Sequence, residues 1–194
     1  MKTIGITGGI ASGKSYVTSQ LIKEGYTVID CDEISHNLLK EEIVKKRLLK
    51  EFGNGIFENT NISRIKLGNR VFNNPEELQI LNSIIHPLVI EEVKEKIREF
   101  NGEILFVDAP LLYETGLDEI MDAVIVVYVN YKTQVDRLMN RDGIDLSTAK
   151  HKISLQMPLI EKTKKADYII DNSSSFAETN VEIKNILRRI KNEV

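Results

Sequence analysis

Residues 8–15 read Gly-Gly-Ile-Ala-Ser-Gly-Lys-Ser and match the pattern G-x-x-x-x-G-K-[ST]. The match follows an apolar segment, Lys2–Thr7, and precedes a segment, Lys14–Glu24, in which Val17 and Leu21 lie one helical turn apart. This strand–loop–helix context is the one that the motif requires. Its glycines let successive backbone N–H groups turn around an anion, and the helix N-terminus adds partial positive charge. The stretch therefore predicts a phosphate-binding loop.

The loop residues are predicted to divide the work of holding a nucleotide. Lys14 is expected to reach the β- and γ-phosphates, and Ser15 to supply a hydroxyl to Mg²⁺, as in P-loop nucleotide enzymes. Ser12 is expected to shape the loop rather than to perform chemistry. The residues predicted here to contact the nucleotide are Gly9, Ile10, Ala11, Ser12, Gly13, Lys14, Ser15 and Tyr16.

Four further apolar runs predict four more strands. They are Thr27–Asp30, Glu103–Ala109, Ala123–Asn130 and Asp167–Asp171. Their apolar residues are almost continuous rather than alternating, which is typical of strands that are covered on both faces. Helical stretches separate the runs, so we expect an α/β fold with a five-stranded parallel sheet flanked by helices.

Three segments between and after these strands carry helical patterns. Apolar residues recur every three or four positions over Pro75–Phe100, with a possible bend at Pro87. Tyr131–Lys165 is a second helical stretch, and an apolar stripe from Phe176 to Val194 closes the chain. These stripes are best interpreted as core packing.

Composition narrows the class of protein. The 194 residues carry 26 Lys and Arg against 29 Asp and Glu, a net charge of -3, with 42% hydrophobic residues. This balance predicts one soluble domain. The longest apolar run, Ala123–Val129, is too short for a membrane span, and the N-terminus lacks a secretory stretch, so a cytoplasmic protein is expected. A lone cysteine, Cys31, excludes an internal disulfide, and three scattered histidines argue against structural zinc.

Positive charge gathers in one part of the chain. Between Lys132 and Lys165 there are eight lysines and arginines and four acids. The segment forms either a set of solvated helix faces or a surface that meets an anion. Arg137 and Arg141 are four residues apart and share a helix face, with Gln134 and Gln156 nearby. Beside a phosphate loop, such arginines suit phosphate oxygens.

Acidic residues end two of the predicted strands, where ligands bind in open α/β sheets. Asp30 and Asp32 flank Cys31 and can share one face of an extended chain. Asp32 is interpreted either as a carboxylate that orients a substrate hydroxyl and accepts its proton, or as the cap of a helix that begins near Glu33. Asp108 ends the third strand, where a Walker-B-type aspartate holds Mg²⁺. Glu114 either faces the same cleft or caps a loop.

The chain resembles the dephospho-CoA kinase family along its whole length. The landmarks are Thr7 to Ser15, Val28-Ile-Asp-Cys-Asp32, Asn74-Pro-Glu-Glu-Leu78, the turn His86-Pro-Leu-Val89, Asp108-Ala-Pro-Leu-Leu112, Gln134 to Asp142, and Ala166-Asp-Tyr-Ile-Ile-Asp-Asn172. The phosphate loop alone is generic, but its combination with the other landmarks is specific to this family.

The resemblance implies ATP as donor with Mg²⁺, and the ribose 3′-hydroxyl of dephospho-CoA as acceptor. It implies Asp32 as catalytic base, Lys14 and Arg141 as catalytic contacts to the phosphates, and Asn172 near the adenine. Arg64, His86 and Leu111 join Asp32 in the acceptor region. Neither nucleic acid nor membrane is an expected partner, and we expect a monomer or weak homo-oligomer.

The resemblance also implies an organisation within the single domain 1–194. Segments 1–30, 101–130 and 166–194 form the core, 31–100 a helical coenzyme-binding insertion, and 131–165 a mobile lid. We hypothesise that the lid closes over the triphosphate and excludes water.

Two residues depart from the family pattern. Ala11 stands where the family typically has glycine, and Cys31 where alanine is usual. The methyl of Ala11 leaves the loop undisturbed if the local φ is negative. Cys31 is expected to be a small buried hydrophobe.

Two other functions remain as alternatives. One is a P-loop kinase for another small acceptor, such as a nucleoside or nucleotide. The other is a nucleotide switch or an ATP-driven binding module, which is disfavoured because the chain lacks an N-K-x-D motif and the third strand is not followed by D-x-x-G.

Overall fold

The strand that precedes the phosphate loop lies at the centre of a five-stranded sheet. The computed structural model describes residues 1–72 and 74–193, and the sheet has the order β2-β5-β1-β6-β7. The bounds are β1 Lys2–Gly8, β2 Thr27–Asp30, β5 Ile104–Asp108, β6 Ala123–Tyr128 and β7 Tyr168–Asp171. β1 pairs in parallel with β5 and β6, and β6 with β7. The predicted parallel α/β sheet is confirmed.

Burial separates the central strands from the edge strands. Every residue of β5 is buried, as are all residues of β1 after Lys2, so these strands are covered on both faces as predicted. The edge strands are less buried. β7 alternates between buried and exposed residues, with Ile169 46% exposed, whereas β2 buries only Ile29. Both lie at the margin of the sheet, where a strand has a neighbour on one side only.

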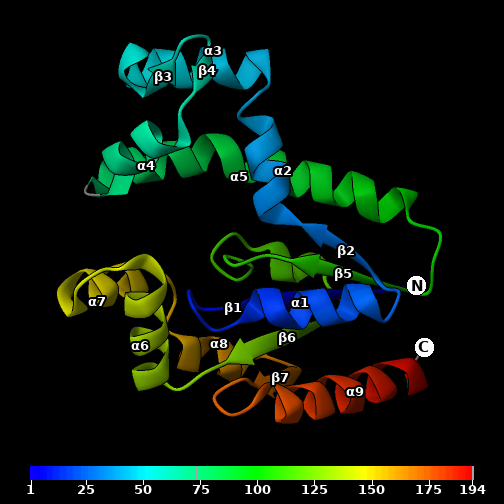
Figure 1. Ribbon diagram of the computed structural model, residues 1–194. Coiled ribbons are helices and arrows are strands. Elements are labelled where there is room, and N and C mark those ends of the chain that lie inside the picture. The colour runs from blue at the N-terminus through cyan, green and yellow to red at the C-terminus, as the bar shows by residue number, and fades with distance from the viewer. Residues whose placement is uncertain (73, 194) are drawn as a thin grey trace. The chain divides into compact units, whose positions relative to one another are not determined.

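Two helices cover one face of the sheet. α1 (Lys14–Lys23) and α9 (Phe176–Asn192) pack their apolar stripes against the strands (Figure 1). The buried cluster that results contains Ile4, Ile6, Val17, Leu21, Ile104, Phe106, Ile125, Val127, Tyr168, Ile170, Ile183, Ile186, Leu187 and Ile190. Val194, the last residue of the predicted stripe, lies outside the described residues. A capping box of Ser175 and Glu178 begins α9.

Three helices form the segment that was predicted as a lid. They are α6 (Tyr131–Asp142), α7 (Leu146–Ser154) and α8 (Leu159–Lys165). Asn130 and Asp145 cap α6 and α7 by accepting hydrogen bonds from backbone N–H groups, and Gly143 ends α6 at φ 64°. Val135, Leu138 and Ala149 form a small buried cluster between α6 and α7, and Ile10 and Ala11 of the phosphate loop pack against it.

The contacts divide the chain into two compact units. The sheet unit comprises residues 1–29 and 99–193 of the described chain, and the helical unit comprises Asp30–Arg98. A 3₁₀ helix, η2 (Leu117–Ile120), lies between β5 and β6 in the sheet unit.

Among its described residues, the helical unit contains four α-helices, with a small hairpin between the second and third. Its elements are α2 Cys31–Leu38, α3 Glu42–Phe52, the 3₁₀ helix η1 Asn54–Ile56, β3 Phe57–Glu58, β4 Asn61–Ile62, α4 Arg64–Phe72 and α5 Pro75–Glu99. The antiparallel pair β3–β4 was not predicted. The predicted helix over Pro75–Phe100 is confirmed and continues through Pro87, so the interpretation of His86-Pro-Leu as a turn was wrong.

Among residues 1–72 and 74–193, no helix combines the length and apolar character that a membrane crossing requires.

Candidate active site

The phosphate loop leaves β1 at the edge where the carboxyl ends of the parallel strands meet. β1 ends at Gly8, β5 at Asp108, β6 at Tyr128 and β7 at Asp171. The register pairs Ile6 with Asp108 and Gly8 with Val127, so these ends are neighbours. Open α/β sheets bind their ligands at this edge.

Two glutamines of the lid segment hold the loop at Ile10. Gln134 Nε2 donates to the Ile10 carbonyl at 2.8 Å, and the Ile10 N–H donates to Gln156 Oε1 at 2.8 Å. A Cβ at Gly9 would stand 2.5 Å from Gln134 Nε2, so only glycine admits this approach. Both polar groups of one loop residue are thereby satisfied by lid side chains.

Asn172 braces the other end of the loop. This residue follows β7 and is 1% exposed. Its Nδ2 donates to the Ser12 carbonyl at 2.8 Å, and its Oδ1 accepts from the Thr179 hydroxyl at 2.9 Å. Gly13 has φ 87°, and a Cβ there would meet Asn172 Nδ2 at 2.0 Å. The second glycine of the motif is therefore required by both backbone conformation and space.

The loop fits an anion such as a polyphosphate. The N–H groups of Lys14 and Ser15 lie in the first turn of α1, where a helix supplies no acceptor of its own. The Ser12 hydroxyl is fully buried and finds no hydrogen-bond partner among residues 1–72 and 74–193. Tyr16, next along α1, stacks on Phe176 at 4.3 Å between ring centroids.

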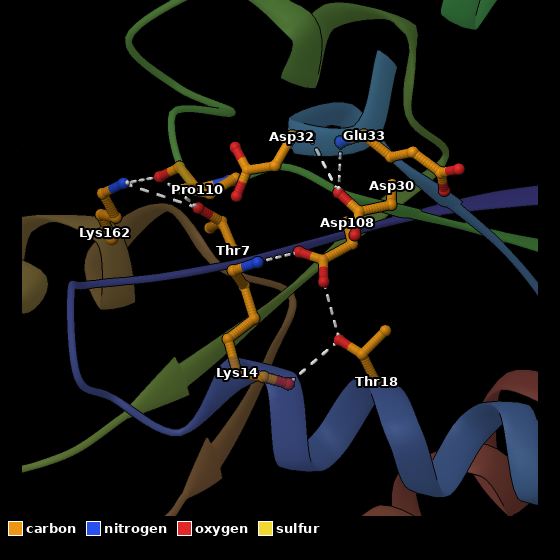
Figure 2. Close-up of polar contacts among 9 residues, drawn as sticks. All are labelled: Thr7, Lys14, Thr18, Asp30, Asp32, Glu33, Asp108, Pro110 and Lys162. Atoms are coloured by element: carbon orange, nitrogen blue, oxygen red, sulfur yellow. Dashed lines mark hydrogen bonds and ion pairs between the residues drawn. The ribbon is translucent and has the colours of Figure 1, made fainter. Parts of the chain in front are cut away.

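Lys14, the first residue of α1, forms an ion pair with Asp108, the last residue of β5 (Figure 2). The Thr18 hydroxyl donates to the other carboxylate oxygen of Asp108 at 2.8 Å. Asp108 is 4% exposed. Thr18 is a site residue that the sequence interpretation missed. The signal was present, because Thr18 lies one helical turn after Lys14 on the same face of α1.

Oxygen donors that suit Mg²⁺ are present at this end of the sheet unit. Ser15 is exposed at the start of α1, and Asp108 presents a carboxylate, the hard oxygen ligand that Mg²⁺ prefers. Within the part of the chain that the structure describes, no group of three or more His, Cys, Asp or Glu side chains is placed to hold a metal ion. Mg²⁺ would thus bind here with few protein ligands, as it does beside substrate phosphates.

The lid arginines lie on α6 as predicted, but in different surroundings. Arg137 lies beside the loop, with its Nη1 3.8 Å from the position that a Cβ would occupy at Gly13. The Arg141 side chain is 57% exposed and bonds Asp142, with 2.8 Å between Nε and Oδ1. Hydrogen bonds from Arg141 and Lys152 lower the pKa of Asp142 to about 2. Arg141 therefore lies on the solvent side of the lid segment.

Leu111 and Glu114 lie in the loop after β5. Leu111 is half-buried, and its carbonyl accepts hydrogen bonds from Thr115. Glu114 accepts the Met157 N–H at 2.9 Å, as in the loop-capping alternative, and Lys162 of α8 lies 3.0 Å from the same carboxylate. Lys162 was not singled out from the sequence, because it is one of three similar lysines in the last turn of α8, with Lys164 and Lys165.

In the helical unit, the two aspartates at the end of β2 have different surroundings. Asp30 is the N-cap of α2, and its Oδ1 accepts from the N–H groups of Asp32 and Glu33 at 2.8 and 3.2 Å (Figure 2). Asp32 is exposed in the first turn of α2. The prediction that both carboxylates share a face of extended chain was wrong, because the chain becomes helical at Cys31. The capping alternative named the wrong aspartate.

The family model and the similar curated proteins point to one family. The dephospho-CoA kinase family matches residues 2–178. The chain is 42% identical over 193 residues to a dephospho-CoA kinase of Carboxydothermus hydrogenoformans, covering 97% of this chain and 94% of the relative. The structure of a dephospho-CoA kinase from Campylobacter jejuni is 31% identical, with a TM-score of 0.75 and 99% and 98% of the two chains covered. A structure from Thermus thermophilus is 29% identical, with a TM-score of 0.82 and 97% of each chain covered.

The chain belongs to the dephospho-CoA kinase family. The match includes both the phosphate loop and the insertion 31–100.

Two residues that the family resemblance assigns to the acceptor region lie in the helical unit. Arg64 is exposed, and its Nη1 lies 3.3 Å from Nδ1 of His36, a residue of α2 that was not predicted. His86 is half-buried in α5, and burial lowers its pKa below the ordinary histidine value. Arg64 and His36 together present a polar pair, whereas His86 favours the neutral form.

Ala11, where the family typically has glycine, adopts φ 60°. The condition under which its methyl would be harmless, a negative φ, is therefore not met. A left-handed conformation costs a non-glycine residue about 1–2 kcal/mol. The methyl packs against the lid cluster of Val135, Leu138 and Ala149, which offsets part of that cost.

We expect Ala11→Gly to be better tolerated than the same change in a helix. The control is Ala177→Gly, in the exposed first turn of α9. Both variants gain the same flexibility when unfolded, so the difference between their free energies of unfolding reports on the folded backbone. In urea unfolding, the free energy of unfolding of Ala11→Gly should exceed that of Ala177→Gly by about 1 kcal/mol. An equal or larger loss for Ala11→Gly would contradict the left-handed conformation.

Proposed function

We propose that this chain transfers the γ-phosphoryl group of ATP to the ribose 3′-hydroxyl of dephospho-CoA, giving coenzyme A and ADP. The observation that carries the proposal is the phosphate loop, whose peptide groups at Ile10 and Ser12 are fixed by Gln134, Gln156 and Asn172. Membership of the dephospho-CoA kinase family supports the choice of acceptor. The alternative of another small acceptor finds no support in those matches.

The sheet unit supplies the groups that hold and polarise the phosphates. The loop N–H groups and Lys14 bind the triphosphate, and Lys14 exchanges its pairing with Asp108 for a phosphate oxygen. Ser15 and Asp108 would hold Mg²⁺, which would supply charge that neutralises the phosphates. Because phosphoryl transfer needs mostly positioning and charge compensation, a rigid loop is the main requirement.

The helical unit supplies most of the proposed groups for the acceptor, and Leu111 of the sheet unit is the exception. Asp32 is the proposed base, which orients the 3′-hydroxyl and accepts its proton. Its exposure in the first turn of α2 leaves the carboxylate accessible to a substrate. Arg64, His86 and Leu111 are proposed as further acceptor contacts, and His36 joins them because it lies beside Arg64.

The lid segment completes the donor site. Arg137, beside Gly13, is proposed to bind phosphate oxygens directly. Arg141 is proposed to reach the phosphates when 131–165 closes, releasing Asp142. Asn172 is proposed to lie near the adenine, with its side chain bracing the loop. We further propose that the enzyme works in the cytoplasm as a monomer or weak homo-oligomer and binds neither nucleic acid nor membranes.

An acceptor panel tests the proposed function. With ATP and Mg²⁺, purified protein should phosphorylate dephospho-CoA, detected as coenzyme A by mass spectrometry. Adenosine, AMP and other nucleosides and nucleotides should be phosphorylated far more slowly, because they lack the pantetheine arm whose binding energy contributes to positioning. Preference for a nucleoside would replace the proposal with the other kinase, and phosphate release without any acceptor would revive the nucleotide switch.

Asp32→Asn should abolish most transfer while ATP still binds. Loss of a general base typically costs about 10²–10⁴-fold in rate. Glu33→Gln is the matched control, because it removes a negative charge at the next residue of the same exposed helix turn. Steady-state kinetics and calorimetric ATP binding check both variants. Near-normal turnover of Asp32→Asn would remove Asp32 from the role of base.

Arg141→Ala should lower kcat by about 10³-fold, as expected for an arginine that compensates transition-state charge. The fold should be unaffected, because the Arg141 side chain is 57% exposed. Arg188→Ala, an exposed arginine on α9, serves as the control and should keep full activity. Unchanged kinetics for Arg141→Ala would show that this arginine stays in solvent during turnover.

A further inference from the structure

Lys162 of α8 is a lysine with no exposed surface. An ammonium group removed from water is costly unless each of its protons is bound. Its Nζ lies 2.7 Å from the Pro110 carbonyl oxygen, 3.0 Å from the Glu114 carboxylate and 3.5 Å from Thr7 Oγ1. The three protons of the ammonium therefore have three acceptors.

These acceptors come from two segments, the end of β1 and the loop after β5, that converge on the phosphate-binding edge. Thr7 lies in β1 immediately before the loop, and Pro110 lies two residues after Asp108 (Figure 2). The Thr7 hydroxyl itself donates to the Pro110 carbonyl at 3.1 Å. Glu114 also accepts the Met157 N–H, which precedes α8. One buried cation thus ties the end of β1, the loop after β5 and the lid segment together.

The charge of Lys162 also interacts with that of Lys14 in the phosphate loop. Burial lowers the pKa of Lys162, and the hydrogen bond and charge of Glu114 oppose that effect. The positive charge of Lys14 lowers the pKa of Lys162 further, so the two ammonium groups repel one another. Glu114 and Asp108 each balance one of these cations.

We propose that Lys162 is a positioning residue for phosphoryl transfer, which holds Thr7 and Pro110 so that the phosphate loop and Asp108 keep the geometry that Lys14 requires. The inference rests on the proposed function. It predicts that loss of Lys162 lowers kcat much more than it raises the KM for ATP, because a lysine with no exposed surface would act on the nucleotide only through Thr7 and Pro110.

The test separates positioning from folding with two variants. Lys162→Met alone leaves the Glu114 carboxylate without its cation and is expected to destabilise the protein. In Lys162→Met/Glu114→Gln both charges are gone, the glutamine oxygen can still accept the Met157 N–H, and Thr7 can still donate to Pro110. Urea unfolding should therefore show stability recovered in the double variant, whereas its kcat should stay about 10- to 100-fold below the parent.

Lys164→Met is the matched control, because the Lys164 side chain is 64% exposed on the same helix and pairs with Glu161. This variant should keep both kcat and stability. If the double variant regains kcat together with stability, Lys162 is only structural and the inference is overturned.

Hydrogen exchange gives a second readout that does not depend on the acceptor. Amides of residues 8–13 should exchange faster in the double variant than in the parent, with no substrate present. Unchanged exchange at these amides would also overturn the inference. A parent protein that leaves dephospho-CoA unmodified contradicts the proposed function instead, and the exchange comparison still decides the role of Lys162.

Discussion

The main chain of the phosphate loop can hold an anion only if its path is fixed before the anion arrives. Three side-chain amides fix it, since Gln134 and Gln156 satisfy both polar groups of Ile10, and Asn172 satisfies the Ser12 carbonyl. A loop carbonyl that is already bound does not turn toward the phosphates, where it would repel them. Because the amides come from the lid segment and from the residue after β7, the loop depends on the whole sheet unit.

Most of the sheet unit could be predicted from the sequence, because its central strands are buried on both faces and read as continuous apolar runs. The hairpin β3–β4 escaped prediction because its strands are two residues long, too short to show a period. Pro87 suggested a turn, yet it lies within α5. A proline inside a helix leaves the carbonyl four residues earlier without its donor, and that residue, Ser83, is exposed, so water can satisfy it.

The site could be predicted only where a residue's role follows from its backbone. The glycines of the loop are of this kind, because a side chain at Gly13 would collide with Asn172. Asp30 and Asp32 are not, since aspartate caps helices equally well at either position and only the start of α2 decides between them. Lys162 resembles its neighbours Lys164 and Lys165 in sequence, and its burial is a property of tertiary packing alone.

Charge balance supports the proposed role of the arginines in the lid segment. Lys14 is paired with Asp108 and Lys162 with Glu114, so the lysines of the site bring no excess positive charge to an arriving nucleotide. A triphosphate brings several negative charges, and its transfer spreads charge over the phosphoryl oxygens. Compensation must come from groups whose partners are in solvent or easily exchanged. Arg141 meets that condition, because its partner Asp142 also binds Lys152 and keeps a cation when Arg141 leaves, as proposed.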